Sequence, residues 1–221
     1  MNKAIVLLSG GLDSATTLYY AKYRGYKVYA LIFDYGQRHK KEVKCALKIA
    51  RSAQCPYQIV KINLPWKGSA LLDKTMKVPH HRRLDAKDIP PTYVPARNII
   101  FLSFAASYAE AVGAKKIFIG ANAVDYSGYP DCRPDFFQAF AKVLKKGLKT
   151  GVEGRAISVE TPLILMTKAQ IVRLGVKLKV PHALTWSCYT GSRWMCGQCD
   201  SCRLRQKGFA EAGVKDPSAI A

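Results

Sequence analysis

The stretch Ser9-Gly10-Gly11-Leu12-Asp13-Ser14 decides the fold, because it stands between an apolar run at residues 4–8 and an amphipathic helical pattern that begins near Asp13. Gly10 and Gly11 lack side chains, so an anion can approach their N–H groups, and the start of the helix directs its positive dipole end to the same point. Ser9 and Ser14 add hydroxyl donors. A Ser-Gly-Gly sequence is also a common turn, but its place at the end of a first strand favours a phosphate-binding loop.

The spacing within this loop differs from two familiar nucleotide-binding motifs. No lysine follows the second glycine as in a Walker A loop, and the pattern is not Gly-x-Gly-x-x-Gly. The stretch resembles instead the SGGxDS loop of the N-type ATP pyrophosphatases. Enzymes of that superfamily use ATP to activate a carbonyl or carboxylate group for attack by nitrogen or sulfur.

The composition indicates a globular protein with an unusually basic surface. Hydrophobic residues make up 49% of the 221 residues, and 35 Lys and Arg against 15 Asp and Glu give a formal charge of +20. This charge has three explanations: attraction of nucleic acid, attraction of small anionic substrates, or solvation of the surface. The basic residues are spread along the chain, which favours the last two. No run approaches the ~20 apolar residues of a membrane span, and no signal peptide is evident. The thiols fit a reducing cytoplasm.

Alternating strand and helix patterns run through most of the chain and predict an α/β fold with an open, doubly wound parallel sheet. The predicted strands are at residues 4–8, 28–33, 57–62, 117–119 and 157–160. The predicted helices are at residues 13–24, 42–53, 99–112, 135–146 and 168–174. A capping box at Thr167 and Gln170 begins the last helix, and Gly175 is expected to end it. We expect one α/β domain at residues 1–180, with a zinc-binding segment at residues 181–221 packed on it.

Polar side chains stand where further elements meet the carboxyl edge of the sheet. Asp34, Gln37 and Arg38 follow the second strand, where they can reach the adenosine half of a nucleotide or form an ordinary polar loop. Arg97 lies at the start of a helix, a favourable place for a phosphate or carboxylate clamp. Lys168 opens a later helix and is a candidate phosphate ligand.

Residues 125–134 follow the fourth strand and combine rings with hydrogen-bonding groups. Such a segment can be a plain surface turn, but it also supplies what binds a flat heterocycle, namely rings for stacking and acceptors for exocyclic N–H groups. We therefore predict a substrate-binding role for Tyr126, Ser127, Tyr129, Asp131 and Arg133.

The proline-rich segment at residues 64–93 shows no clear period, and a loop of this length is usually functional or mobile. It carries His80, His81, Arg82 and Arg83. Adjacent histidines point in different directions, so this patch is interpreted as an exposed basic lid rather than a metal site.

Four cysteines have the spacing of metal ligands: Cys188, Cys196, Cys199 and Cys202. Gaps of two residues allow neighbouring thiolates to turn onto one ion, and four thiolates make a closed tetrahedral zinc site. An iron–sulfur cluster is the competing interpretation. With four protein ligands no position stays open for a catalytic water, so we expect a structural role for zinc.

Several motifs, in this order, resemble the 7-cyano-7-deazaguanine synthase family: SGGLDS, FDYGQRH, YVPARN, LSFAA, DYSGYPDCR, and CYTG followed by CGQCDSCRLR. The resemblance implies an adenine nucleotide alpha hydrolase-like fold and an ATP-dependent ligase that converts 7-carboxy-7-deazaguanine and ammonia into the nitrile, a precursor of queuosine and archaeosine. It implies one zinc ion per chain and commonly a homodimer. Ala96 stands where the family has Gly, Tyr93 stands where Phe is usual, and residues 65–88 show no family pattern.

The expected roles follow from these motifs and their positions. The residues expected to bind ATP with Mg²⁺ are Leu8, Ser9, Gly10, Gly11, Leu12, Asp13, Ser14, Asp34, Gln37 and Arg38. Asp13, Ser14, Arg97 and Lys168 are the expected catalytic residues, acting by positioning and charge stabilisation. The expected partners are small molecules, with no membrane and no direct nucleic-acid contact. Two other classes stay open: a tRNA-modifying thiolase or lysidine-type ligase, which shares the ATP loop, and a zinc-ribbon nucleic-acid binder without enzymatic activity.

Overall fold

A computed structural model describes residues 2–84, 88–124 and 128–218 of the chain. Its elements, in order, are β1 (Lys3–Leu7), α1 (Leu12–Tyr23), β2 (Lys27–Asp34), α2 (Lys41–Ser52), β3 (Tyr57–Lys61), α3 (Arg97–Val112), β4 (Lys116–Phe118), η1 (Pro130–Cys132), α4 (Pro134–Gly147), α5 (Lys149–Val152), β5 (Ser158–Glu160), α6 (Lys168–Lys177), η2 (His182–Leu184) and α7 (Asp200–Ala212).

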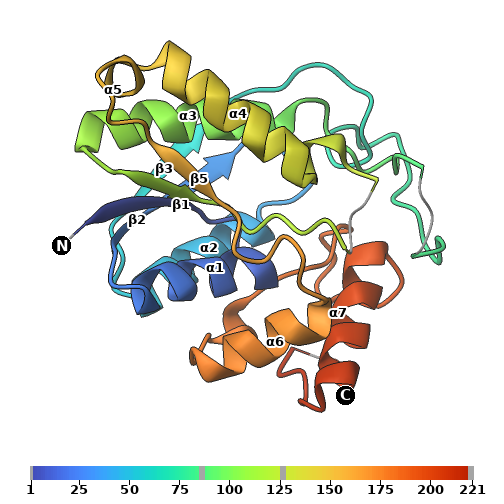
Figure 1. Ribbon diagram of the computed structural model, residues 1–221. Helices are drawn as coiled ribbons and strands as arrows, with labels where there is room; N and C mark the ends of the chain where they lie inside the picture. Colours follow the sequence, from blue (N-terminus) through green and yellow to red (C-terminus); the bar gives the residue numbers. More distant parts are fainter. Residues whose placement is uncertain (1, 85–87, 125–127, 219–221) are drawn as a thin grey trace.

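The strands of the described chain form one parallel sheet in the order β3-β2-β1-β4-β5. After β3 the chain returns past β1 and adds β4 on the other side, so the direction of winding reverses between β1 and β4 (Figure 1). The loops that leave two such neighbouring strands diverge, and ligands bind in the crevice between them at the carboxyl edge. The predicted doubly wound parallel sheet is confirmed.

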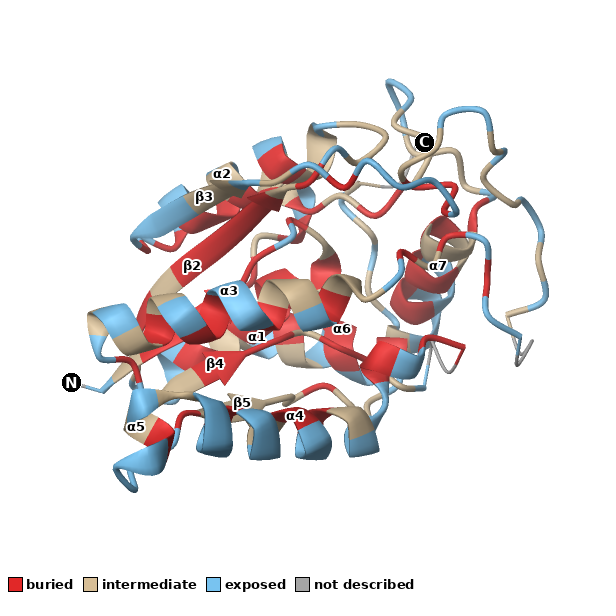
Figure 2. Cartoon of the chain, turned by 90° about the horizontal axis from the view of Figure 1, so that it is seen from above, coloured by how far each residue is buried: buried red, intermediate tan, exposed pale blue. Residues whose placement is uncertain are grey.

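Strand β1 separates two apolar cores because its side chains alternate between the two faces of the sheet. Ile5 and Leu7 pack with α3 and α4, whereas Val6 and Leu8 pack with α1 and α2 on the opposite face (Figure 1). Figure 2 shows the central strands buried between helices whose outer faces are exposed. The central strands are therefore apolar on both sides, as a parallel sheet between two helical layers requires.

The predicted elements lie within two residues of the observed ends, with one exception. The capping box at Thr167 and Gln170 is confirmed, but the prediction that Gly175 ends this helix is wrong, because α6 continues to Lys177. A Cβ atom at Gly175 would lie 2.4 Å from Nε2 of His182. This glycine therefore allows close packing inside the helix and is not a stop signal.

Helix α7, which the sequence patterns did not predict, lies beside α6 (Figure 1). It follows the cysteine-rich segment and starts directly after Cys199. None of the described helices combines the length and hydrophobicity needed to cross a bilayer.

The segment at residues 64–93 is anchored at several points rather than projecting as a free lid. The guanidinium of Arg38 donates to backbone carbonyls of Ala70 and Met76 at 3.1 and 2.8 Å. Further along, His80 forms a β-bridge with Cys199. His80 is exposed, as predicted, but its backbone lies on the cysteine-rich segment.

Candidate active site

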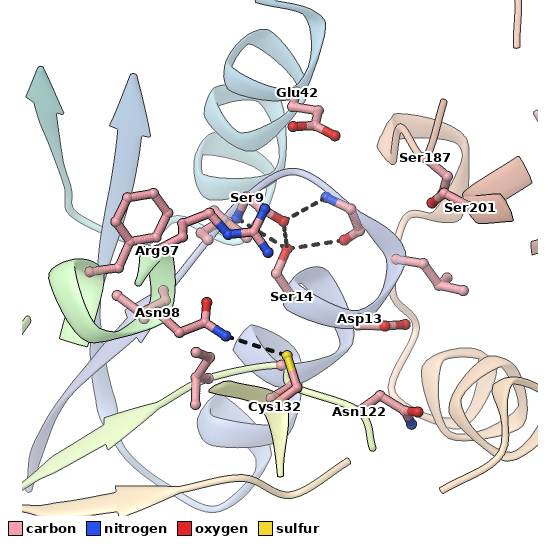
Figure 3. A pocket seen from close by; sticks show the side chains of 18 of the residues that line it. Ser9, Asp13, Ser14, Glu42, Arg97, Asn98, Asn122, Cys132, Ser187 and Ser201 are labelled. Atoms are coloured by element: carbon pink, nitrogen blue, oxygen red, sulfur yellow. Dashed lines mark hydrogen bonds between the residues drawn. The ribbon is translucent and has the colours of Figure 1, made fainter. Parts of the chain in front are cut away.

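The loop at residues 9–14, for which the sequence predicts phosphate binding and which is called the phosphate loop below, joins β1 to α1 and is closed by its own two serine hydroxyls (Figure 3). Ser9 Oγ and Ser14 Oγ lie 2.9 Å apart, the Ser9 N–H donates to Ser14 Oγ at 3.2 Å, and Ser14 Oγ donates to the Gly11 carbonyl at 3.1 Å. Gly10 has a φ of +89°, and a Cβ atom there would lie 2.2 Å from the backbone oxygen of Glu42. Glycine at this position therefore lets α2 pack directly against the loop.

Lys168 and Asp13 form an ion pair beside this loop. Lys168 Nζ lies 2.8 Å from each carboxylate oxygen of Asp13, and the side chains are 8% and 18% exposed. The aliphatic part of Lys168 crosses α7 at Gly208, where a Cβ atom would lie 2.3 Å from Lys168 Cγ. The C-terminal helix thus sets the position of a lysine that the sequence predicts to be a phosphate ligand.

A cavity of about 230 Å³ lies at the carboxyl edge of the sheet, between the ends of β1 and β4 (Figure 3). It brings together most of the residues for which the sequence predicts a role. Those lining it are Leu8, Ser9, Gly11, Leu12, Asp13, Ser14, Gln37, Arg97, Tyr129 and Lys168.

Arg97 is the first residue of α3 and contributes a guanidinium to the cavity. The preceding Ala96 has a φ of +55°, in the left-handed region. Burial acts to lower the pKa of Arg97, but Tyr35, Tyr129 and Asp131 outweigh it, so the pKa is raised. The guanidinium therefore keeps its charge in a site of low dielectric constant, where it attracts phosphate or carboxylate strongly.

Asp131 and Arg133, both predicted to bind substrate, are not among the residues that line the cavity. The Asp131 carboxylate accepts the backbone N–H of Asn98 at 3.1 Å, and its carbonyl accepts the Asn98 side-chain amide at 2.9 Å. Asp131 thereby holds the start of α3, while Arg133 is exposed just before α4. Tyr126 and Ser127 lie outside the described residues.

Three of the residues expected to bind ATP also lie away from the cavity lining. Asp34 accepts a hydrogen bond from Lys40 at 2.9 Å, and Arg38 is used in holding the segment at residues 64–93. Gly10 faces α2. Gln37 does line the cavity, and its side-chain oxygen accepts the backbone N–H of Tyr35 at 2.8 Å.

The cavity also contains side chains that the sequence analysis missed: Tyr35, Glu42, Asn122, Trp186, Ser187, Tyr189, Ser201 and Arg205. Burial raises the pKa of Glu42 to about 7. Arg205 is 2% exposed and pairs with Asp216 through two contacts of 2.7 and 2.8 Å. Some of these residues could have been found from their nearness in the sequence to predicted site residues. Tyr35 and Glu42 flank the polar run at residues 36–41, and Trp186 and Tyr189 lie close to Cys188.

The four predicted metal ligands come together, with all their sulfur atoms within 4.8 Å of one another. Cys196 Sγ and Cys202 Sγ are 4.0 Å apart, close to the edge of about 3.8 Å in a zinc tetrahedron with Zn–S bonds of about 2.3 Å. An iron–sulfur cluster would hold the sulfurs farther apart, because irons and sulfides stand between them. Backbone N–H groups of Cys199 and Cys196 donate to Cys196 Sγ and Cys188 Sγ, both at 3.3 Å. Such donors stabilise metal-bound thiolates, so the donor set fits zinc.

The family model described as queuosine biosynthesis protein QueC matches residues 3–213. The chain belongs to the QueC family. A 7-cyano-7-deazaguanine synthase of Nostoc punctiforme is 52% identical over 223 residues, which cover 99% of this chain and 100% of that relative. A 7-cyano-7-deazaguanine synthase of Thermoplasma volcanium is 54% identical over 217 residues, which cover 97% of this chain and 89% of that relative.

Among solved structures, NMN synthetase from Francisella tularensis has a TM-score of 0.52 to this QueC-family chain at 18% identity. The match covers 97% of this chain and 78% of the other. At this identity the similarity supports the fold alone.

Proposed function

We propose that the chain is an ATP-dependent 7-cyano-7-deazaguanine synthase, which converts 7-carboxy-7-deazaguanine and ammonia into the nitrile that serves as a precursor of queuosine or archaeosine. The observation that carries this proposal is the convergence of the phosphate loop, Arg97 and Lys168 on one cavity. It occurs in a QueC-family chain whose curated relatives, about half identical over nearly the full length, are 7-cyano-7-deazaguanine synthases.

The phosphate loop is the proposed site for the pyrophosphate part of ATP. Ser9, Gly11 and Ser14 line the cavity at the start of α1, where the helix dipole favours an anion, and the Gly11 N–H donates to Ser9 Oγ at 3.3 Å. Mg²⁺ would accompany the phosphates and neutralise their charge, with Asp13 offering the oxygen ligands that this ion prefers. Lys168 would exchange Asp13 for phosphate as the nucleotide binds.

The substrate carboxylate is proposed to lie against Arg97, opposite the phosphate loop. Arg97 can bind it through two parallel hydrogen bonds, the geometry that a guanidinium offers to a carboxylate. Tyr129, whose hydroxyl is fixed by Thr92 at 2.7 Å, offers a ring to the heterocycle. Asp131 acts indirectly in this scheme, because it holds the helix turn that carries Arg97.

A carboxylate does not react with ammonia until one of its oxygens becomes a leaving group, so ATP must first transfer a phosphoryl or adenylyl group to it. Ammonia then displaces that group and gives an amide. The amide oxygen needs a second activation before elimination leaves the nitrile. Both steps present a carbonyl oxygen to ATP, so one cavity serves both, and the protein contributes mainly positioning and charge stabilisation.

One zinc ion per chain is proposed for the four-cysteine cluster, in a structural role. Four thiolates fill a tetrahedral site and leave no position for a reacting water. Zinc would fix the segment at residues 188–202. This segment contains Tyr189 and Ser201 of the cavity lining and directly follows Trp186 and Ser187, which also line the cavity. Seven free thiols fit a cytoplasmic protein, and by family resemblance we propose a homodimer, which light scattering would test.

The test is mass spectrometry of a reaction that contains the protein, ATP, Mg²⁺, an ammonium salt and 7-carboxy-7-deazaguanine. A nitrile product is expected, and AMP or ADP identifies the group that is transferred. An unchanged carboxylate, with ATP turnover that depends on added tRNA, would contradict the proposal and favour the tRNA-modifying alternative.

A further inference from the structure

Glu42 is a half-buried acid in the wall of the cavity. Its carboxylate lines the cavity but has neither an ion-pair nor a hydrogen-bond partner within residues 2–84, 88–124 and 128–218. Lys168 is paired with Asp13 and Arg205 with Asp216, whereas Arg97 lines the same cavity and its positive charge acts on Glu42.

The position of Glu42 is fixed by the packing of α2 on the phosphate loop. It lies in the first turn of α2, and this turn packs directly against Gly10. Figure 3 shows the Glu42 side chain on the α2 side of the cavity, apart from the hydrogen bonds that close the Ser9–Ser14 loop. Its carboxylate is therefore held close to the nucleotide site by a rigid element, without being part of the loop.

A carboxylate without an ion-pair partner does not suit the two anionic substrates proposed for this cavity. Both ATP and the substrate carboxylate would be repelled by it, and burial of an unpaired charge is costly. The third substrate has the opposite character, because ammonia in neutral water is almost entirely protonated. Ammonium is a small cation with hydrogen-bond donors and no acceptor, so its binding site needs a buried negative charge.

We propose that the Glu42 carboxylate binds the ammonium ion that supplies the nitrogen and accepts the proton whose loss frees the attacking lone pair. This inference rests on the proposed function and adds a binding site for the third substrate. Ser187 and Trp186 line the same cavity, where Arg205 Nη1 donates to Ser187 Oγ at 3.4 Å and Lys41 Nζ lies 4.4 Å from the centroid of the Trp186 ring.

The step is balanced as follows. One N–H bond of ammonium breaks, and its proton passes to a carboxylate oxygen of Glu42. The released lone pair forms the C–N bond at the activated carbonyl carbon, and the C–O bond to the phosphoryl or adenylyl group breaks, with its electron pair leaving on that oxygen. A second proton leaves the nitrogen for solvent, which gives the neutral amide.

The electrostatic surroundings of Glu42 suit this exchange. Burial raises its pKa to about 7, Arg97 of α3 acts against this rise, and Cys188 of the cysteine cluster adds to it. Tyr35, which follows β2, and Cys45 of α2 also interact electrostatically with Glu42. A proton acceptor with a pKa near the working pH can take up a proton and release it again in each cycle.

The variant that tests the proposal is Glu42→Gln, which keeps the shape and removes the charge. Initial rates are measured against ammonium at saturating ATP and 7-carboxy-7-deazaguanine, and then against hydroxylamine, a nitrogen nucleophile that is uncharged at neutral pH. We expect the KM for ammonium to rise at least about tenfold. The KM for ATP and the rate of hydroxamate formation should stay within about twofold. The matched control is Glu211→Gln, an exposed acid of α7, which should leave every parameter unchanged.

Three results would overturn the inference. An unchanged KM for ammonium would show that Glu42 does not bind it. An equal rise in the KM for ATP or in the Mg²⁺ requirement would place Glu42 in the nucleotide site instead. Loss of hydroxamate formation would show that the carboxylate supports activation and not nitrogen binding. If the wild-type protein forms neither amide nor nitrile, the proposed function fails and this inference fails with it. If the wild type is active and Glu42→Gln has the same kinetic parameters, only the inference is refuted.

Discussion

The ammonium group of Lys168 is bound by both carboxylate oxygens of Asp13 at 2.8 Å, although 155 residues separate the two in the sequence. The pair joins the loop at residues 9–14 to the start of α6 and holds a cation beside the proposed phosphate site. Because Lys168 is nearly buried, its charge is weakly screened and acts strongly on any phosphate that replaces Asp13.

Replacing Lys168 with Met should lower kcat/KM for ATP by about 100-fold or more, because a positioned cation is lost where negative charge develops. The double variant Asp13→Asn/Lys168→Met should lose less than the product of the two single losses, since the residues are in contact. Steady-state kinetics measure both effects. The control Lys207→Met removes an exposed lysine and should be nearly neutral, and an equal loss there would contradict the assignment.

Gly208→Ala should lower activity by about 10- to 100-fold without removing the metal, because the new methyl group would occupy the path of Lys168 and displace its ammonium. The measurements are kcat/KM and zinc content. Gly147→Ala is the matched control, since no atom lies within 4 Å of a Cβ there. Normal kinetics in Gly208→Ala would mean that α7 does not position the lysine.

Glu42→Gln should change the pH dependence of folding stability. The pKa of Glu42 is about 7 in the folded state and about 4.5 in the unfolded state. Between pH 4.5 and pH 7, Glu42 is therefore protonated in the folded state and ionised in the unfolded state. The contribution of Glu42 to the free energy of unfolding is fully present below pH 4.5 and is lost as the pH rises through 7. The variant should therefore gain stability relative to the wild type as the pH rises from 5 to 8, by up to about 3 kcal/mol. Denaturant unfolding at several pH values measures this, and a difference independent of pH would contradict it.

Ala96→Gly should stabilise the protein by about 0.5–1 kcal/mol, because Ala96 has a φ of +55°, where the Cβ atom is strained. The melting temperature should rise by about 2–4 °C per kcal/mol for a chain of this size. The control Ala111→Gly, at an exposed position of α3 with ordinary helical geometry, should instead destabilise by about 1 kcal/mol. A lower melting temperature in both variants would exclude strain at Ala96.

Loss of the proposed zinc ion should loosen the segment at residues 64–93 as well as the cysteine cluster. His80 pairs with Cys199, and Arg82 forms an ion pair with Asp200 at 3.8 Å. Cys196→Ala or a strong chelator should remove one metal equivalent, lower the melting temperature and speed tryptic cleavage at Arg82. Cys45→Ala, a half-buried thiol on α2 outside the cluster, should keep the metal. Retention of metal and melting temperature by Cys196→Ala would disprove the structural site.

Features encoded by short spacings could be predicted from the sequence. The phosphate loop, the alternating strands and the four cysteines each depend on neighbours a few residues away, and the structure confirms the sheet and brings the sulfurs together. Gly175 misled the prediction because a glycine serves equally as a helix end or as a point of close packing, and only its distance to His182 distinguishes the two.

Much of the cavity could not be predicted, because its residues meet only through packing between distant elements. Glu42 enters the site because α2 rests on Gly10, and Arg205 enters it from a helix that begins inside the cysteine cluster. Arg38 has the residue type and position of a nucleotide ligand, but its guanidinium donates to backbone carbonyls of the segment at residues 64–93 instead.

The contact between Lys168 and Gly208 has a consequence for a truncated form of the protein. The loop at residues 9–14 and the lysine that faces it lie far apart in the sequence, and the side chain of this lysine packs on Gly208 of α7. A chain that lacks α7 would therefore lack the packing that sets the position of Lys168 beside this loop.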